Sequence, residues 1–126
     1  MKLPTELSYT ATHEWVRFTG KNMAYIGITD HAQEALGDLV FVNFPAKGAA
    51  VTAGEILCDV ESVKAVSDIY SPVTGTVSEF NNTLENSPES INSDPYGSWI
   101  AKIEEITDTA GLLTAEEYQQ LIEKEG

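Results

Sequence analysis

The sequence predicts a mainly β fold, a small barrel or sandwich of short strands with a short internal helix and a C-terminal helix. Two observations predict this class: runs rich in β-branched and aromatic residues recur along most of the chain, and turn-forming Gly, Pro, Asn and Ser separate them. At 126 residues the chain has the length of one domain with its own hydrophobic core. We therefore expect residues 1–126 to form a single domain.

The first half of the chain predicts a hairpin, a helix and a strand, in that order. Strand-like runs at residues 15–18 and 23–28 flank a turn with the sequence TGKN. Asp30 is the expected N-cap of a helix of about two turns that ends at Gly37. The run LVFVNFP at residues 39–45 is apolar at nearly every position, which predicts a strand buried on both faces.

The second half predicts further strands joined by glycine turns. Strand character continues through residues 55–65 and 66–70 and resumes at residues 76–80. Between them, Pro72 takes a favoured second turn position, and Gly54 and Gly75 are each expected at a turn, the latter with a positive φ.

The C-terminal part predicts a loop, a last strand and a helix. Residues 81–99 are rich in Asn, Ser and Pro, which is typical of an irregular loop, here with a helical turn near Leu84. Residues 99–106 should form the final strand. A capping box, T-x-x-E, opens a helix over about residues 114–124, whose apolar residues recur at helical spacing.

Composition excludes several classes of function. Twenty acidic residues against seven basic ones give a formal charge of −13. This charge disfavours binding to nucleic acids and to anionic membranes, and it favours partners that present basic patches. The alternative is that the charge serves only to keep the protein soluble. No segment resembles a signal peptide or a membrane helix, so we expect a cytoplasmic protein if the source is bacterial, with a mature mitochondrial protein as the less favoured alternative. The single cysteine, Cys58, is expected to be a buried apolar residue.

Motifs of conventional catalysis are missing from the sequence. It holds no GxSxG elbow, GxGxxG turn or P-loop. His13 and His31, even with Cys58, fall short of a four-ligand structural zinc site, and each histidine is expected to cap or to pack. We therefore expect no catalytic residues and no metal site.

Lys64 is the only basic residue between Lys47 and Lys102, an interval with eight acidic residues. It lies in the segment DVESVKAVSDIYSP, where SVKA can form a type I turn with Ser62 at its first position. The residues alone leave three interpretations open: an exposed lysine paired with a neighbouring acid, a Schiff-base lysine, or an attachment point at a turn tip. The first is the default for any lysine. A Schiff-base lysine requires a depressed pKa, and the acidic neighbours of Lys64 would raise its pKa instead.

Five blocks, in order along the chain, resemble the H-protein family of the glycine cleavage system. They are HEWV, GITDHAQEALGDLVFVNFP, VESVKAVSDIYSPVTGTV, INSDPYGSW and LLTAEEYQQLI, and together they cover nearly the whole chain. ESVKA is highly specific in that context. The resemblance implies a lipoyl-domain barrel–sandwich hybrid of two facing sheets with peripheral helices, in which an exposed hairpin turn carries the modified lysine.

The resemblance also implies a cofactor and partners. Lys64 would be amide-linked to lipoic acid, and the chain would be a monomeric carrier rather than an enzyme. A glycine decarboxylase with pyridoxal phosphate would load an aminomethyl group, and an aminomethyltransferase would pass the one-carbon unit to tetrahydrofolate. Dihydrolipoyl dehydrogenase would then reoxidise the dithiol with NAD. Lipoate-attaching enzymes complete the expected partners.

Several residues around the arm follow from the same resemblance. Glu14, the hydroxyl of Thr12 and Asp68 are candidates for a polar cleft that shelters the aminomethyl group. Glu61 and Ser62 are candidates for recognition by the attaching enzyme and for the turn. For the two cleft carboxylates, an ordinary surface position is the alternative.

One detail departs from the family pattern, and two other functions stay open. PYGSW has only Ser98 between Gly97 and Trp99, where family members often have two residues. The first alternative is an H-like protein that mainly relays lipoyl groups to other lipoate-dependent enzymes; it shares ESVKA, so sequence does not separate it from glycine cleavage. The second is a plain β-barrel binding module in which Lys64 is never modified.

Overall fold

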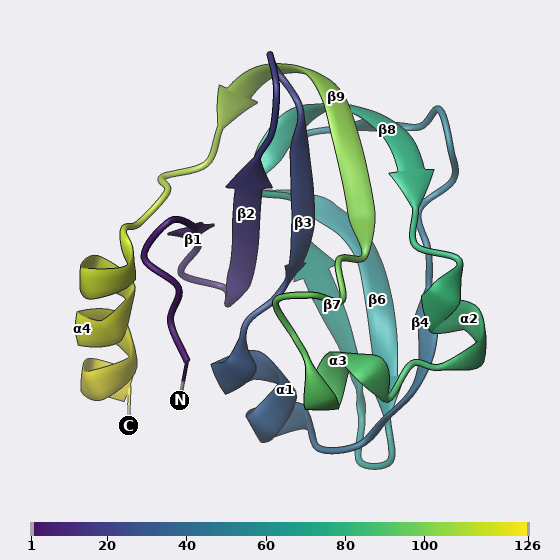
Figure 1. Cartoon of the computed structure of the whole chain (residues 1–126), viewed down its shortest axis with the longest axis vertical. Helices are drawn as coiled ribbons and strands as arrows, with labels where there is room; N and C mark the ends of the chain where they lie inside the picture. Colours follow the sequence, from purple (N-terminus) through teal and green to yellow (C-terminus); the bar gives the residue numbers. More distant parts are fainter. Residues whose placement is uncertain (1, 126) are drawn as a thin grey trace.

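A computed structural model describes residues 2–125, which form two β-sheets that face each other across a shared core (Figure 1). Every strand pairing is antiparallel. The six-stranded sheet has the order β1 (Ser8–Tyr9), β2 (Glu14–Phe18), β3 (Ala24–Ile28), β9 (Ala101–Thr109), β8 (Val73–Phe80), β5 (Ala50–Val51). The three-stranded sheet has the order β4 (Leu39–Asn43), β6 (Ile56–Ser62), β7 (Val66–Tyr70). The predicted mainly β class with two facing sheets is confirmed.

The main core lies between the two sheets. Ile26 and Ile103 come from the larger sheet, Val60 and Ile69 from the smaller one, and all four side chains are buried. Burial of such side chains is the largest favourable contribution to folding. Cys58 also lies in this core, as predicted.

A second apolar cluster holds the C-terminal helix α4 (Ala115–Glu125) against the first two strands. The rings of Tyr9 and Tyr118 stack with their centroids 4.9 Å apart, and Trp15 is fully buried beside them. The predicted capping box opens the helix, since the backbone N–H of Glu117 donates to the Thr114 hydroxyl and the Glu117 carboxylate accepts from the Thr114 N–H.

Helix α1 (Asp30–Leu36) follows β3, and its N-cap differs from the prediction. The cap is Thr29, whose hydroxyl accepts the Ala32 N–H at 3.1 Å, and not Asp30. Asp30 is instead the first helical residue, where its negative charge interacts favourably with the positive end of the helix dipole. Its carboxylate accepts a hydrogen bond from the side-chain amide of Gln33. The helix ends at Gly37, as predicted, with a φ of +82°.

Strand β4 is not buried on both faces, contrary to the prediction. Leu39 and Val42 point into the core, while Val40 and Phe41 are 53% and 49% exposed. The strand lies at the edge of a three-stranded sheet that packs on the larger sheet with one face only. A run of apolar residues does not distinguish this arrangement from a fully buried strand.

The turn predicted at Gly75 is absent from the structure. Strand β8 begins at Val73, and Gly75 lies within it with no positive φ, next to a register shift between Thr74 and Thr76. Gly54, in contrast, has the φ of +87° expected of a glycine turn.

The loop before the last strand contains two helical turns, α2 (Thr83–Asn86) and α3 (Ser90–Ser93). The predicted turn around Leu84 is confirmed as α2; α3 was not predicted. The last strand begins at Ala101 rather than at Trp99, and the Trp99 ring packs edge-on against Tyr25. In the short PYGSW segment, the buried hydroxyl of Ser98 donates to the Ser90 carbonyl at 3.0 Å.

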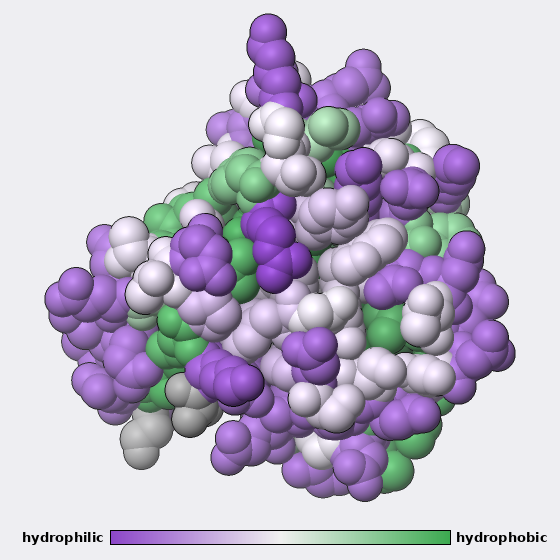
Figure 2. Space-filling model, in the orientation of Figure 1, coloured by the Kyte–Doolittle hydropathy of each residue, from purple (hydrophilic) through white to green (hydrophobic). Residues whose placement is uncertain are grey.

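Two surface properties bear on function. Hydrophilic side chains predominate around the rim of the face seen in Figure 2, in line with the charge of −13. Across residues 2–125, none of the helices combines the length and the apolar character needed to cross a bilayer.

Candidate functional site

The β6–β7 hairpin presents Lys64 at its tip, and its loop extends past the ends of both strands at the bottom of Figure 1. The Ser62 N–H donates to the Ala65 carbonyl at 2.8 Å. The Ser62 hydroxyl accepts the N–H groups of Lys64 and Ala65, each at 3.1 Å. Because none of the residues 62–65 has a positive φ, the primed hairpin turns are excluded. Ser62 therefore shapes the turn in place of an Asn-Gly pair.

Neighbouring segments support the hairpin from the side. The Val63 N–H donates to the Asp38 carbonyl at 3.0 Å. The Asn92 side chain of α3 holds the segment around Asp38 in turn, since it accepts the Leu39 N–H and donates to the Gly37 carbonyl, both at 2.9 Å. Hydrogen bonds thus connect α3, the α1–β4 corner and the turn that carries the lysine.

The Lys64 side chain lies over the C-terminal end of α1. Its Nζ donates to the Ala35 carbonyl at 3.1 Å, and the residue is exposed. A cation at this end of a helix is favourable because the last carbonyls carry partial negative charge. Among residues 2–125, no carboxylate lies within 4.0 Å of the Lys64 amine, so the neighbouring acids Glu61 and Asp68 do not pair with it.

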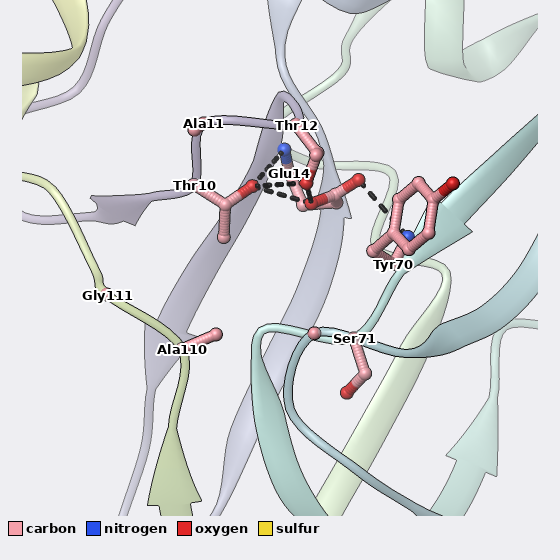
Figure 3. A pocket seen from close by; sticks show the side chains of 9 residues that line it. Thr10, Ala11, Thr12, Glu14, Tyr70, Ser71, Ala110 and Gly111 are labelled. Carbon is pink, nitrogen blue, oxygen red and sulfur yellow. Dashed lines mark hydrogen bonds between the residues drawn. The ribbon is translucent and has the colours of Figure 1, made fainter.

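A pocket of about 310 Å³ lies beside the β1–β2 turn, and its polar side is made around Glu14 (Figure 3). The Glu14 side chain is 1% exposed. Its Oε1 accepts the hydroxyls of Thr10 and Thr12, each at 2.5 Å, and its Oε2 accepts the Tyr70 N–H at 3.2 Å. The pocket is lined by Thr10, Ala11, Thr12, Glu14, Gly54, Tyr70, Ser71, Ala110 and Gly111.

The electrostatics of Glu14 are those of a carboxylate removed from water. Burial raises the pKa of Glu14 above its ordinary value, and the hydrogen bonds from Thr10, Thr12 and the Tyr70 N–H only partly oppose this rise. No basic side chain of the described residues forms an ion pair with it. A cationic group that entered the pocket would favour the ionised form of Glu14, whose carboxylate is already oriented by three donors.

The structure brings two of the predicted cleft residues together and leaves the third outside. Thr12 and Glu14 share the pocket, whereas Asp68 is an exposed residue of β7 opposite Asp59 and does not line it. Glu61 lies on β6 close to the turn, opposite Val66 of β7.

Sequence reasoning missed most of the remaining pocket residues. Thr10 could have been found from the sequence, because the segment TATHE places the hydroxyls of Thr12 and Thr10 two and four residues before the carboxylate of Glu14. Tyr70 contributes a backbone N–H, which leaves no signal in the sequence. Ala110 and Gly111 come from the loop after β9 and reach the pocket only through the fold.

Comparisons with known proteins agree with this geometry. A family model described as glycine cleavage H-protein matches residues 7–125. The glycine cleavage system H protein of Lachnoclostridium phytofermentans is 54% identical over 125 residues, covering 99% of this chain and 98% of that protein. The H protein of Rubrobacter xylanophilus is 52% identical, with 98% of each chain covered.

A solved structure leads to the same family. The crystal structure of a glycine cleavage system H protein from Mycobacterium marinum matches with a TM-score of 0.89 at 41% identity, covering 95% of this chain and 98% of that one. Sequence and fold are thus similar to the same proteins over nearly their whole lengths. This chain therefore belongs to the glycine cleavage H-protein family, whose members carry lipoyl-lysine and serve glycine cleavage as non-catalytic carriers.

Proposed function

We propose that Lys64 is the residue that carries lipoic acid in amide linkage. The observation that supports this most directly is the exposed amine of Lys64 at the tip of a hairpin whose turn is fixed by Ser62. Condensation of this amine with the lipoate carboxyl group removes the positive charge and releases the side chain from α1 as the base of a tether. When bound, the lipoyl group supplies a dithiolane that accepts and releases the carried group.

The hairpin has two tasks in this function. It holds one lysine in a fixed geometry that an attaching enzyme can read, and Ser62 and Glu61 lie where such an enzyme would contact the turn. It also places the tether on a rigid base, so that the arm has a high effective concentration at a docked partner's active site. The exposed side chains of Val63 and Val66 flank the lysine on the same tip.

The partners follow from the steps of glycine cleavage. A glycine decarboxylase with pyridoxal phosphate supplies the aminomethyl group, an aminomethyltransferase passes its carbon to tetrahydrofolate, and dihydrolipoyl dehydrogenase reoxidises the dithiol. A lipoate-attaching enzyme modifies Lys64. Support comes from the family to which the chain belongs. The acidic surface suits transient docking to basic patches, where opposite charge raises the association rate more than the final affinity.

The Glu14 pocket shelters the amine end of the loaded arm in this proposal. The carboxylate of Glu14 would accept a hydrogen bond from the amine, and the hydroxyls of Thr10 and Thr12 keep it oriented. A cationic amine beside Glu14 favours the ionised carboxylate and so opposes the effect of burial on its pKa. The pocket is partly open, so its walls shield the carried group from water in part.

The arm has a suitable length for this pocket. Tyr70 lies six positions after Lys64 along the hairpin and strand, which is at most about 20 Å at roughly 3.3 Å per residue. An extended lipoyl-lysine has about a dozen bonds between Cα and sulfur, or about 15 Å, and the aminomethyl group adds to this. The amine can thus approach the end of β7, where the Tyr70 N–H meets Glu14.

Intact-protein and peptide mass spectrometry of the chain from its native source tests the attachment. We expect a lipoyl mass increment on the peptide that contains Lys64, in a fraction of molecules that grows when lipoate is supplied. The other lysine peptides serve as internal controls and should be unmodified. A chain that carries no lipoyl increment on the Lys64 peptide would contradict the proposal and leave a binding module whose lysine is never modified.

Replacing Glu14 with alanine tests the pocket. We expect Glu14→Ala to be lipoylated normally but to lose the aminomethyl group about tenfold faster, which corresponds to one charge-assisted hydrogen bond of about 1.5 kcal/mol. The measurement is the first-order release of ammonia and formaldehyde from the loaded carrier without aminomethyltransferase. Asp68→Ala is the matched control, since it removes a carboxylate of β7 outside the pocket and should leave the rate unchanged. An unchanged rate in Glu14→Ala would remove Glu14 from the mechanism.

A further inference from the structure

Three side chains able to ligate a metal meet where the C-terminal helix joins the rest of the fold. His13 precedes β2, His31 lies in the first turn of α1, and Glu125 ends α4. One ligand atom from each lies within 4.8 Å of the others. We propose that these residues form a binding site for Zn²⁺ or a similar divalent transition metal, which clamps the end of α4 to α1 and to the segment before β2.

The distances around His13 suit a tetrahedral metal. Its Nε2 lies 3.2 Å from Glu125 Oε1. With metal–ligand bonds of about 2.0 Å, two ligands of a tetrahedral Zn²⁺ are separated by about 3.3 Å, so the observed spacing already matches one edge of the coordination sphere. The rings of His13 and His31 have centroids 4.7 Å apart at a tilt of 40°. A side-chain rotation of the partly exposed His31 completes a third ligand position, and water fills the fourth.

The other nitrogen of His13 has a partner that fixes the ligating tautomer. His13 Nδ1 lies 2.7 Å from the Tyr118 hydroxyl, which in turn lies 2.8 Å from the Thr29 hydroxyl. When Nδ1–H donates to Tyr118 and Tyr118 donates to Thr29, the lone pair of Nε2 points toward Glu125. Metal-binding histidines commonly donate their second N–H to an oxygen in this way.

The backbone of His13 is preorganised as well. It has a φ of +75°, a conformation that non-glycine residues adopt rarely, and two hydrogen bonds hold it: its N–H donates to the Thr10 carbonyl and its carbonyl accepts the Thr29 N–H, both at 3.1 Å.

The ligand set determines which cation fits. Two imidazoles and one carboxylate favour Zn²⁺ and related transition metals, while Mg²⁺ and Ca²⁺ prefer oxygen ligands. A preference for Zn²⁺ over Mg²⁺ and Ca²⁺ would therefore distinguish a specific site from the general attraction of cations to a chain of charge −13. The histidines alone gave no sign of the site in the sequence, because the third ligand comes from the other end of the chain.

Zinc titration of the full-length chain, first treated with chelator, tests the site. We expect one equivalent to bind by calorimetry and to raise the melting temperature, whereas Mg²⁺ at the same concentration has neither effect. In nitrogen-correlated NMR spectra, the ring resonances of both His13 and His31 should shift on addition of Zn²⁺.

Three variants complete the test. His31→Gln and Glu125→Gln change partly exposed residues, so both should fold, and each should weaken Zn²⁺ binding at least tenfold. Glu123→Gln removes a carboxylate from the same helix outside the cluster and should bind as the unchanged chain does. Absence of saturable Zn²⁺ binding, equal affinity in all three variants, or an equal response to Mg²⁺ would each overturn the proposal.

Discussion

Lys64→Arg is expected to abolish lipoylation and, with it, all carrier activity in glycine cleavage, while the chain keeps its fold. The guanidinium group of arginine stays protonated at neutral pH and does not form the lipoyl amide. The structural effect is small because the residue is exposed and an arginine can also donate to the Ala35 carbonyl. We expect the free energy of unfolding to change by less than about 0.5 kcal/mol.

The measurement combines mass spectrometry with a reconstituted assay of glycine-dependent NADH formation. The Lys64→Arg chain should show no lipoyl increment and only background NADH formation. Lys47→Arg provides the matched control, since Lys47 is another exposed lysine of a turn region and its replacement should leave both readouts unchanged. Glycine cleavage by the Lys64→Arg chain at a normal rate would contradict the assignment of Lys64.

The parts of the fold that depend on local chemistry were predictable from the sequence. The β2–β3 hairpin and strand β7 lie where the strand-like runs placed them, and the capping box at Thr114 opens α4. The error at Asp30 is also local. Thr29 and Asp30 are both good N-caps, and the choice between them depends on which residue leaves the strand geometry of β3, which propensity does not specify.

Exposure of β4 was not predictable from its own residues. Val40 and Phe41 are apolar yet exposed, because only one face of the small sheet meets the larger sheet and a register shift between Leu39 and Phe41 interrupts the alternation of side chains. The number and order of strands in each sheet are properties of the whole chain. A local run of apolar residues carries no information about them.

The two halves of the candidate site differ in the same way. The turn at Lys64 could be predicted because Ser62 acts on residues within three positions of itself. The environment of Glu14 could not, since a carboxylate is exposed by default and this one is buried by three segments that are distant in sequence. Glu14 was a candidate only through the resemblance to the H-protein family. The fold shows why its pKa is raised, since it buries the carboxylate.

Gly54 and Gly75 show how one residue type serves two physical needs. The sequence predicted a turn at each. In the structure, Gly54 has a φ of +87°, and no atom outside its chain neighbours lies within 4 Å of the position that a Cβ would take. Gly75 has no positive φ, but a Cβ there would lie 2.5 Å from the carbonyl oxygen of Glu104 and 2.7 Å from Ile103 Cγ2. The first glycine is required for its backbone conformation and the second for the close approach of β9.

Gly75→Ala is therefore expected to destabilise the chain by about 3 kcal/mol, and Gly54→Ala by only about 1 kcal/mol. A methyl group at Gly75 meets a backbone oxygen that can move only if β8 and β9 separate, which is costly in a packed sheet. A methyl group at Gly54 meets no atom and costs only the strain of a positive φ. Urea unfolding of both variants, with equal m-values, measures the difference. A loss in Gly54→Ala that equals or exceeds the loss in Gly75→Ala would show that backbone conformation, not crowding between β8 and β9, determines where this fold needs glycine.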